Sequence, residues 1–322
     1  MKSRMRERRT YGSVRGLRRE PLVYSTTGGT MEFIFDYMEN HILRHKLNTL
    51  TQKIYGFDFE NWMAGGYFEG DYIPYSFMQD GKILANVSVN RMHFIQEGVP
   101  KYYIQLGTVM TDEAFRKQGL AKKLVEHILK EYEDKCHGVY LFSNPDALGF
   151  YRRMGFKESD QYQYSLKKDW SCSVKKGAAF RKISEQDEQL RQKYMDAVRN
   201  SAVNSALEHI NKFGLQMFYT ADLHDVYYAD DMDCFAVIEK WKDTLILKSI
   251  ISKQYISMKD AVSHMDIPYN SLILGFPPAF GDRDMFEISV CDDRNDTRLF
   301  YRGKDLESIE KEKLCFPQLS HA

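Results

Sequence analysis

The sequence predicts a two-domain α/β protein in which helices and strands alternate along the chain. Its length of 322 residues exceeds the roughly 100–200 residues that usually share one hydrophobic core. A polar, lysine-rich stretch at 167–176 separates two halves that both carry apolar patterns. We therefore expect one domain at 31–168 and a C-terminal α/β domain at 180–322.

The composition excludes several classes of protein. With 45 basic and 45 acidic residues, the surface has no net charge that would attract nucleic acid or an anionic membrane. No apolar run reaches the ~20 residues that span a bilayer, and the start lacks the apolar core of a secretory signal. The five cysteines are an odd number and include no CxxC pair, which disfavours a disulfide framework and a zinc site. We expect a cytoplasmic protein.

Residues 1–30 form a basic leader, with eight Lys and Arg against two Glu and no apolar period. We exclude this segment from the fold and expect it to be disordered or the artefact of an upstream start. An organellar presequence or a basic nucleic-acid arm is the alternative.

The first domain opens with a helix and a hairpin. Apolar residues recur at three- and four-residue steps over 37–55, which predicts an amphipathic helix. Two strands at 72–78 and 83–89 flank Asp80-Gly81, a strong hairpin signal because Gly accepts a positive φ.

Four further elements complete the first domain. The pattern predicts a strand at 102–110, a helix at 119–132 with one apolar face, a short buried strand at 138–142 and a helix at 145–154.

The second half shows the same order of elements. Helices are expected over 185–213, followed by strand, strand, strand, helix and strand between residues 226 and 276. This order matches residues 72–142 and suggests a degenerate internal duplication.

The loop between the third strand and its helix carries the first chemical signal, Arg116-Lys117-Gln118-Gly119-Leu120-Ala121. A helix N-terminus exposes unpaired N–H groups and the positive end of the helix dipole, which suits a diphosphate. Gly119 and the small Ala121 allow close approach of the backbone, and Arg116 and Lys117 add cationic donors.

A second motif lies one helix and one buried strand downstream. It consists of Asn144, Ala147 and the run from Phe150 to Phe156, which contains Tyr151 and ends in Gly155-Phe156. Together the two motifs resemble the GCN5-related N-acetyltransferase (GNAT) superfamily, whose cofactor loop reads (Arg or Gln)-x-x-Gly-x-(Gly or Ala) and whose later helix carries a Tyr before Gly-Phe. The resemblance covers about 135 residues. Many members have Pro where Thr111 stands and Gly where Ala121 stands.

The resemblance implies a mixed, mostly antiparallel and twisted sheet flanked by helices. The strand ending near Met110 would splay from the strand at 138–142 and leave a slot for the pantetheine arm of acetyl-CoA. Backbone groups of Val109, Met110 and Thr111 would pair with that arm, and Asn144 would face the cofactor. The N–H groups around the pyrophosphate would be those of Gln118, Gly119, Leu120, Ala121 and Lys122.

Attack of an amine on a thioester needs a proton acceptor, donors for the developing oxyanion and an acid for the leaving thiolate. We assign the acid to Tyr151 and the oxyanion donor to the backbone N–H of Met110. Glu97, Glu69 and Asp71 are loop carboxylates that could serve as the base, and a water chain would serve equally well.

The predicted function is N-acetyl transfer from acetyl-CoA to an amine, which is a small molecule, a peptide or a protein. The alternatives are transfer of another acyl or aminoacyl group, as in tandem enzymes of the superfamily, and a non-catalytic CoA-responsive binding protein. In the second half, residues 252–257 stand in the place of the cofactor loop without a glycine, so that half is not expected to bind CoA. His41 and His45 share a helix face but lack a third ligand, so no metal is expected.

Overall fold

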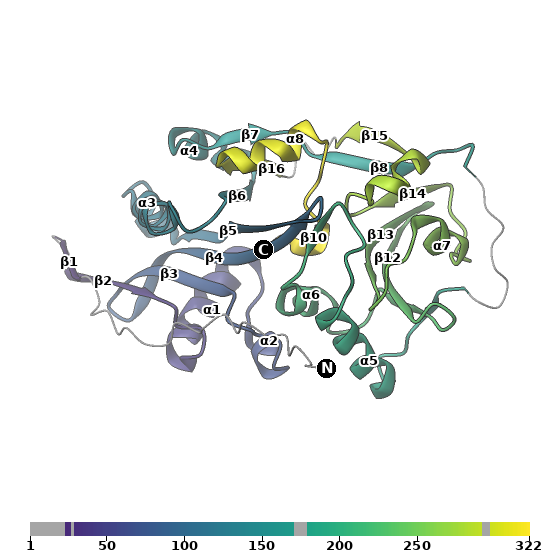
Figure 1. Ribbon diagram of the computed structural model, residues 1–322. Helices are drawn as coiled ribbons and strands as arrows, with labels where there is room; N and C mark the ends of the chain where they lie inside the picture. The colour runs from purple at the N-terminus through teal and green to yellow at the C-terminus, as the bar shows by residue number, and fades with distance from the viewer. Residues whose placement is uncertain (1–22, 27–28, 171–178, 292–296) are drawn as a thin grey trace, which may run out of the picture.

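The computed structural model of the protein describes residues 23–26, 29–170, 179–291 and 297–322. Two helix-flanked sheets lie side by side, which confirms the predicted α/β class and its mostly antiparallel strands (Figure 1). None of the helices in the described part of the chain combines the length and apolar character needed to cross a bilayer.

The first sheet runs, in spatial order, through β1 (Val23–Thr26), β2 (Gly29–Phe35), β3 (Tyr72–Gln79), β4 (Lys82–Gln96), β5 (Val99–Thr111), β6 (Gly138–Ser143), β16 (Arg298–Arg302) and β7 (Lys157–Ser159), and β10 (Leu207–His209) pairs with the end of β4. The second sheet runs through β15 (Phe286–Val290), β8 (Tyr162–Leu166), β14 (Ser271–Leu274), β13 (Thr244–Ile251), β12 (Cys234–Trp241), β11 (Val226–Ala229) and β9 (Arg181–Lys182).

The α-helices are α1 (His41–Tyr55), α2 (Glu60–Ala64), α3 (Leu120–Tyr132), α4 (Leu148–Arg153), α5 (Glu188–Arg199), α6 (Phe213–Thr220), α7 (Met258–Ser263) and α8 (Glu307–Lys311). Short 3-10 turns are η1 (Glu113–Phe115), η2 (Pro145–Ala147), η3 (Phe280–Met285), η4 (Lys304–Leu306) and η5 (Gln318–Ser320).

The predicted elements of the first half are present in the predicted order. The hairpin turns at Asp80 and Gly81, with φ of 49° and 74°. α1 begins four residues later than its apolar pattern suggested, because the side chain of Asn40 caps it by accepting the N–H groups of Ile42 and Leu43.

The basic leader needs a correction. Residues 1–22 and 27–28 lie outside the described residues, but Val23–Thr26 forms β1 and pairs antiparallel with Gly29–Phe35. Excluding all of 1–30 from the fold was therefore wrong for these residues. β2 pairs with β3 along one edge, and its other edge is free to pair with a further strand. Backbone groups make this pairing, so it does not require an apolar pattern in the added strand.

The two sheets exchange strands, which the sequence did not indicate. β8 precedes the predicted boundary but lies in the second sheet, between β14 and β15. β16 comes from the end of the chain and enters the first sheet between β6 and β7. The boundary at 167–176, of which 171–176 lie outside the described residues, therefore does not separate the sheets.

The second half repeats the topology of the first. β11, β12, β13 and β14 follow one another as antiparallel, antiparallel and parallel neighbours, with α7 before β14. β3, β4, β5 and β6 have the same directions, with α3 before β6. The predicted helical stretch at 185–213 is shorter, since α5 ends at Arg199 and Leu207–His209 extends along the free edge of β4 as β10.

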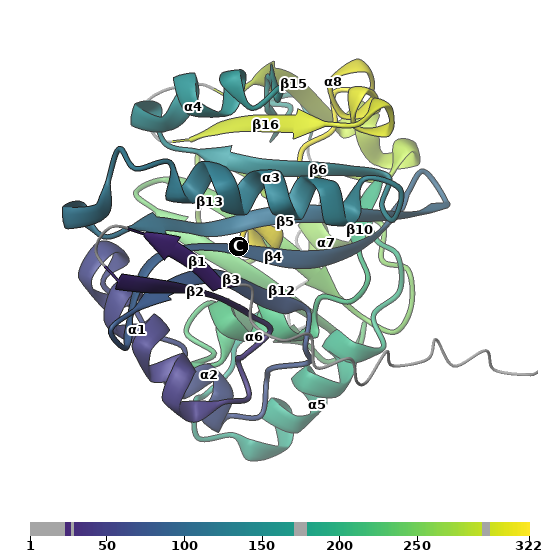
Figure 2. The ribbon, with the colours of Figure 1, turned by 90° about the vertical axis from the view of Figure 1, so that its left-hand side faces the viewer.

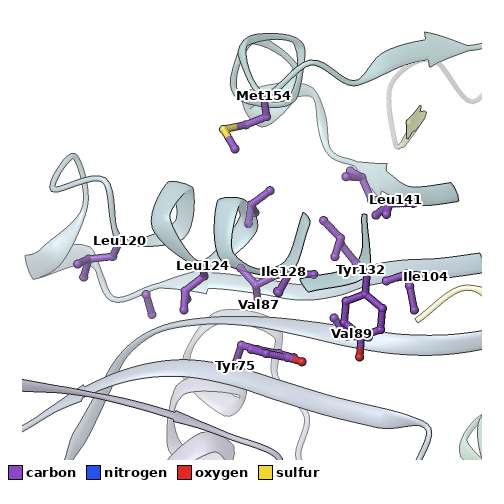
Figure 3. Packing of buried hydrophobic residues seen from close by; sticks show 14 of the residues in the cluster. Tyr75, Val87, Val89, Ile104, Leu120, Leu124, Ile128, Tyr132, Leu141 and Met154 are labelled. Carbon is purple, nitrogen blue, oxygen red and sulfur yellow. The ribbon is translucent and has the colours of Figure 1, made fainter. Parts of the chain in front are cut away.

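α3 covers one face of the first sheet (Figure 2). Its residues Leu120, Leu124 and Ile128 point at Val87 and the neighbouring apolar side chains of the strands (Figure 3). Burial of each such side chain stabilises the fold by ~1.5–3 kcal/mol, so this packing fixes where the N-terminus of α3 lies relative to the end of β5.

Candidate active site

The first sheet opens between β5 and β6. These parallel strands pair only at Tyr103–Gly138, Ile104–Val139 and Gln105–Tyr140, and then diverge. A cleft of about 1040 Å³ lies at the opening. Its lining includes eight of the predicted site residues: Val109, Met110, Thr111, Arg116, Lys117, Ala121, Asn144 and Tyr151.

β5 is distorted at the point where it leaves β6. Its register to β4 shifts between Asn86–Met110 and Ser88–Gly107. Thr108, inside this bulge, has a φ of 46°. A β-branched residue rarely adopts positive φ, and such strain persists where surrounding structure imposes it, often at functional sites.

The bulge decides which backbone groups face the cleft. The N–H of Asp112 donates to the carbonyl of Leu84 on β4 at 2.8 Å. Hydrogen-bonded pairs alternate along an antiparallel ladder, so the N–H of Met110, opposite Asn86, also faces β4. The assignment of the oxyanion donor to Met110 is therefore corrected, because that N–H belongs to the sheet.

Val109 and Thr111 face the cleft instead. The hydroxyl of Tyr55 donates to the carbonyl of Val109 at 2.9 Å, and Nε of Arg116 donates to the carbonyl of Thr111 at 3.4 Å. Both donors line the cleft. The side chain of Met110 is buried in the core under α1, at 2% exposure.

The N-terminus of α3 lies at the cleft. Gly119 is its N-cap residue with a φ of 75°, and no side chain caps the helix in the part of the chain that the structure describes. Such an end leaves N–H groups and a partial positive charge for an anion. Gln118, Gly119, Leu120 and Lys122 belong to this turn without lining the cleft, and Leu120 packs in the core.

The other wall of the cleft comes from the segment after β6. Asn144 precedes η2, and Tyr151 lies on α4 with its ring against Phe150, Phe156 and Phe300. Burial raises the pKa of Tyr151 well above its usual value, so the phenol is neutral at physiological pH.

A buried chain of hydrogen bonds ends at Thr108. Nδ2 of Asn86 donates two hydrogen bonds. One goes to the carbonyl of Thr108 at 2.9 Å, and a carbonyl can only accept. The other goes to the hydroxyl of Ser88 at 2.9 Å. The Ser88 hydroxyl donates to the Tyr72 hydroxyl at 2.7 Å, which donates to Oγ1 of Thr108 at 2.9 Å. The Thr108 hydroxyl accepts from Tyr72, so its own hydrogen remains available to an acceptor in the spaces that Thr108 lines.

A second cavity, of about 150 Å³, adjoins the cleft. Phe57, Thr108 and Ala322 line both spaces. The second cavity lies between β4, the segment from Phe57 to Tyr72 and α6 of the second half, so the two halves form it together. We call it the side cavity.

Two of the three candidate bases border the side cavity. Asp71 receives Nδ2 of Asn211 at 2.9 Å and lies 3.6 Å from Nε of Arg91, and burial raises its pKa. Glu69 pairs with Arg199 at 3.3 Å. Glu97 lies in the turn between β4 and β5, where its N–H bonds to the carbonyl of Ala206, and it borders neither space.

No group of three or more His, Cys, Asp or Glu side chains in the described ranges is placed to hold a metal ion. A sheet that opens between two parallel strands, with a helix N-terminus at the opening, suits a long diphosphate-bearing molecule such as an acyl-CoA. Together with the family match that follows, these features place the protein among the acyltransferases. Residues 38–156 match the model of the acetyltransferase (GNAT) family, and the chain therefore contains a domain of that family.

Solved structures share the fold over both halves. A probable N-acyltransferase of unknown function from Enterococcus faecalis has 14% identity and a TM-score of 0.51, over 87% of this chain and 74% of its own. A GCN5-related N-acetyltransferase from Kribbella flavida has 14% identity and a TM-score of 0.52, over 85% and 71%. Another from Anabaena variabilis has 12% identity and a TM-score of 0.50, over 84% and 72%. No curated protein matches the chain.

Proposed function

We propose that the protein transfers an acetyl group from acetyl-CoA to the nitrogen of an amine. The observation that carries this proposal is the uncapped N-terminus of α3 beside the cleft between β5 and β6. The diphosphate lies on that N-terminus near Arg116 and Lys117, and the pantetheine arm follows β5, where backbone groups of Val109 and Thr111 face it.

The thioester lies at the bulge of β5, where the cleft meets the side cavity. The amine attacks the carbonyl carbon from the side cavity, a C–N bond forms and the carbonyl oxygen gains negative charge. The N–H of Val109 and the hydroxyl of Thr108 donate to this oxygen, and both are held in place before the reaction begins. The departing sulfur takes a proton from the phenol of Tyr151.

Proton balance needs two transfers from nitrogen. The acceptor ammonium loses one proton before attack, and the new amide nitrogen loses a second, which returns through water to Tyr151. We assign both to water, because the side-chain carboxylates that border the side cavity in the described residues are paired: Asp71 with Arg91 and Asn211, and Glu69 with Arg199.

Calorimetry with acetyl-CoA and free CoA, followed by thiol release with a panel of amines, tests the proposal. We expect binding of both nucleotides and thiol release with at least one amine. Absence of any CoA binding would overturn the enzyme assignment. Binding without thiol release for every amine would indicate a CoA-responsive binding protein instead.

The variant Tyr151→Phe tests the role of the phenol. We expect turnover to fall about 100-fold, the lower end for loss of a general acid, with the Kd of acetyl-CoA unchanged. The matched control is Tyr162→Phe, since Tyr162 lies on β8 in the second sheet. Unchanged turnover of Tyr151→Phe at several pH values would remove Tyr151 from the mechanism.

A further inference from the structure

The walls of the side cavity are mainly aromatic. Phe59 lies 4.9 Å from Tyr72 and 6.1 Å from Trp62, and the ring of Phe218 meets Phe57 and Trp62 edge to face at 5.7 and 6.0 Å. These rings come from both halves of the chain, because α6 supplies Phe218.

The polar atoms of these rings are already used by the protein. The indole N–H of Trp62 donates to the carbonyl of Gly214 at 2.7 Å. The hydroxyl of Tyr72 bonds to Ser88 and Thr108. The part of an occupant that lies against these rings therefore meets carbon surface, and it gains most from an apolar or aromatic body.

The size of the side cavity fits one ring. Its volume of about 150 Å³ is close to that of an apolar cavity in another protein that holds a single benzene molecule, roughly 150 Å³. Along β4 it extends from Thr108, beside Ser88, to His209, opposite Phe94. The six residue steps from Ser88 to Phe94 limit the occupant to less than about 20 Å in length.

The far end of the side cavity is polar but not anionic. His209 is 4% exposed, and neither of its ring nitrogens has a hydrogen-bond partner among the described residues. Burial lowers the pKa of His209 to about 3, so its ring is neutral.

The neighbouring Asn211 has no donor left for His209, and only its carbonyl oxygen could accept a second hydrogen bond. Its Nδ2 donates to Asp71 and to the carbonyl of Arg91, and its Oδ1 accepts the N–H of His93. A neutral imidazole offers one donor and one acceptor, which a hydroxyl group complements with either tautomer.

We propose that the acceptor is a primary amine that carries a single aromatic ring, with the amine at Thr108 and a hydroxyl on the far side of the ring bonded to His209. This inference rests on the proposed function and names its substrate class. A diamine fits less well, because the carboxylates of Asp71 and Glu69 are paired and would not bind a second cation. A peptide fits less well, because its amide groups would find few partners between the aromatic walls.

Thiol release is measured with 2-phenylethylamine, its 4-hydroxy derivative, 1,5-diaminopentane and a lysine-containing peptide. We expect kcat/KM for the ring-bearing amines to exceed that for the diamine about 10- to 100-fold, the factor that burial of one phenyl side chain supplies. A series of 4-hydroxyphenyl amines with one to four methylene groups between ring and nitrogen shows, by its highest kcat/KM, how far the ring lies from the amine. Equal or greater activity with the diamine or peptide would overturn the substrate class but leave the proposed function standing, whereas failure of every amine would overturn both.

Phe218→Ala enlarges the side cavity, and the matched control is the exposed Phe280→Ala. We compare kcat/KM for a two-ring amine with kcat/KM for 2-phenylethylamine. We expect the ratio of these two values to rise about tenfold in Phe218→Ala, because the widened cavity accepts the larger substrate. The ratio in Phe280→Ala stays at the wild-type value. An unchanged ratio in Phe218→Ala would place the acceptor elsewhere.

His209→Leu removes both ring nitrogens at similar volume. We expect the preference for the 4-hydroxy derivative over 2-phenylethylamine to fall about tenfold, the loss for one hydrogen bond to a buried group. We expect the melting temperature to change little, because leucine has a similar volume and can keep the contact with Phe94, whose ring centroid lies 5.1 Å from that of His209. A preference that survives this change would overturn the role of His209.

Discussion

Both halves of the chain have a helix N-terminus at the corresponding position of the same topology. They differ in what accepts the free N–H groups of that helix end. At α3 the N-cap is Gly119, and no side chain of the described residues caps the helix. At α7 the side chain of Ser257 accepts the N–H of Asp260, and the buried carboxylate of Asp282 accepts the N–H of Met258 at 3.3 Å. The second half thus supplies its own anion, whereas no described side chain takes that place at α3, where we propose that the diphosphate binds.

The openings beside these helices differ in the same way. Beyond the paired part of β13 and β14, the N–H of Gly275 bonds to Leu247 and the carbonyl of Gly275 accepts from Gln318 of η5. A space of only about 30 Å³ remains there, against about 1040 Å³ between β5 and β6. The same topology thus has a packed core where the chain fills the opening, and we propose that it forms a binding site where the opening is left unfilled.

The largest expected effect comes from giving the first half an anion of its own. Ala121→Asp places a carboxylate in the first turn of α3, where it repels a diphosphate at a cost of several kcal/mol. We expect the affinity for acetyl-CoA to fall about 100-fold by calorimetry. Stability does not decrease, because an acidic residue near a helix N-terminus is favourable by ~0.3–1 kcal/mol.

Two further variants separate the effect of charge from those of shape and position. Ala121→Asn has the same shape without the charge, and Lys259→Asp places the charge at the corresponding position of α7. Both should bind acetyl-CoA within a few-fold of the wild type. A comparable loss in Lys259→Asp would mean that the second half also takes part in cofactor binding.

The second largest effect concerns Asp282, the buried carboxylate at the N-terminus of α7. Asp282 accepts the hydroxyl of Tyr255 at 2.8 Å as well as the N–H of Met258, and it is 8% exposed. Asp282→Ala leaves both donors short of a partner, so we expect the free energy of unfolding to fall by about 2 kcal/mol. Urea unfolding measures this, with the exposed Asp284→Ala as the control. A loss of acetyl-CoA affinity without a loss of stability would contradict the structural role.

The bulges of the two halves offer a third comparison. At Lys248, the residue of β13 left out of the pairing with β12, the ammonium group is paired with Glu239. At the bulge of β5 the hydroxyl of Thr108 accepts from Tyr72 and lines the cleft, and we propose that it donates to the thioester oxygen. Thr108→Val should lower kcat about tenfold and leave the KM for acetyl-CoA little changed. This decrease in kcat is smaller than that for loss of a sole oxyanion donor, because the N–H of Val109 remains. Thr108→Ser is the control and keeps the wild-type rate, whereas equal losses in both variants would point to packing.

The sequence predicted the parts of this site that local patterns encode. Gly119 after a strand and before an apolar-faced helix marked the N-terminus of α3, and Tyr151 before Gly155-Phe156 marked the second wall of the cleft. Both lie where a strand or helix of definite period ends, so counting residues was enough to place them.

The parts that depend on pairing could not be predicted in this way. The bulge at Thr108 reverses which backbone groups face the cleft, and a one-residue irregularity in a strand leaves no periodic signal. The insertion of β16 beside β6 depends on which free edge a distant strand finds. His209 and Phe218 reach the side cavity from the second half, and no local pattern links them to β4.

The smallest effect separates the cap of α7 from its buried anion. Ser257→Ala removes a side-chain cap at the start of a six-residue helix and should lower the free energy of unfolding by about 1 kcal/mol. The loss is smaller than for Asp282→Ala because Ser257 is half-buried and water replaces its hydroxyl. Ser257→Asp keeps a capping oxygen and should restore the stability in urea unfolding. If Ser257→Ala weakened acetyl-CoA binding as much as Ala121→Asp, the two helix N-termini would have the same role, and the contrast between the halves would be wrong.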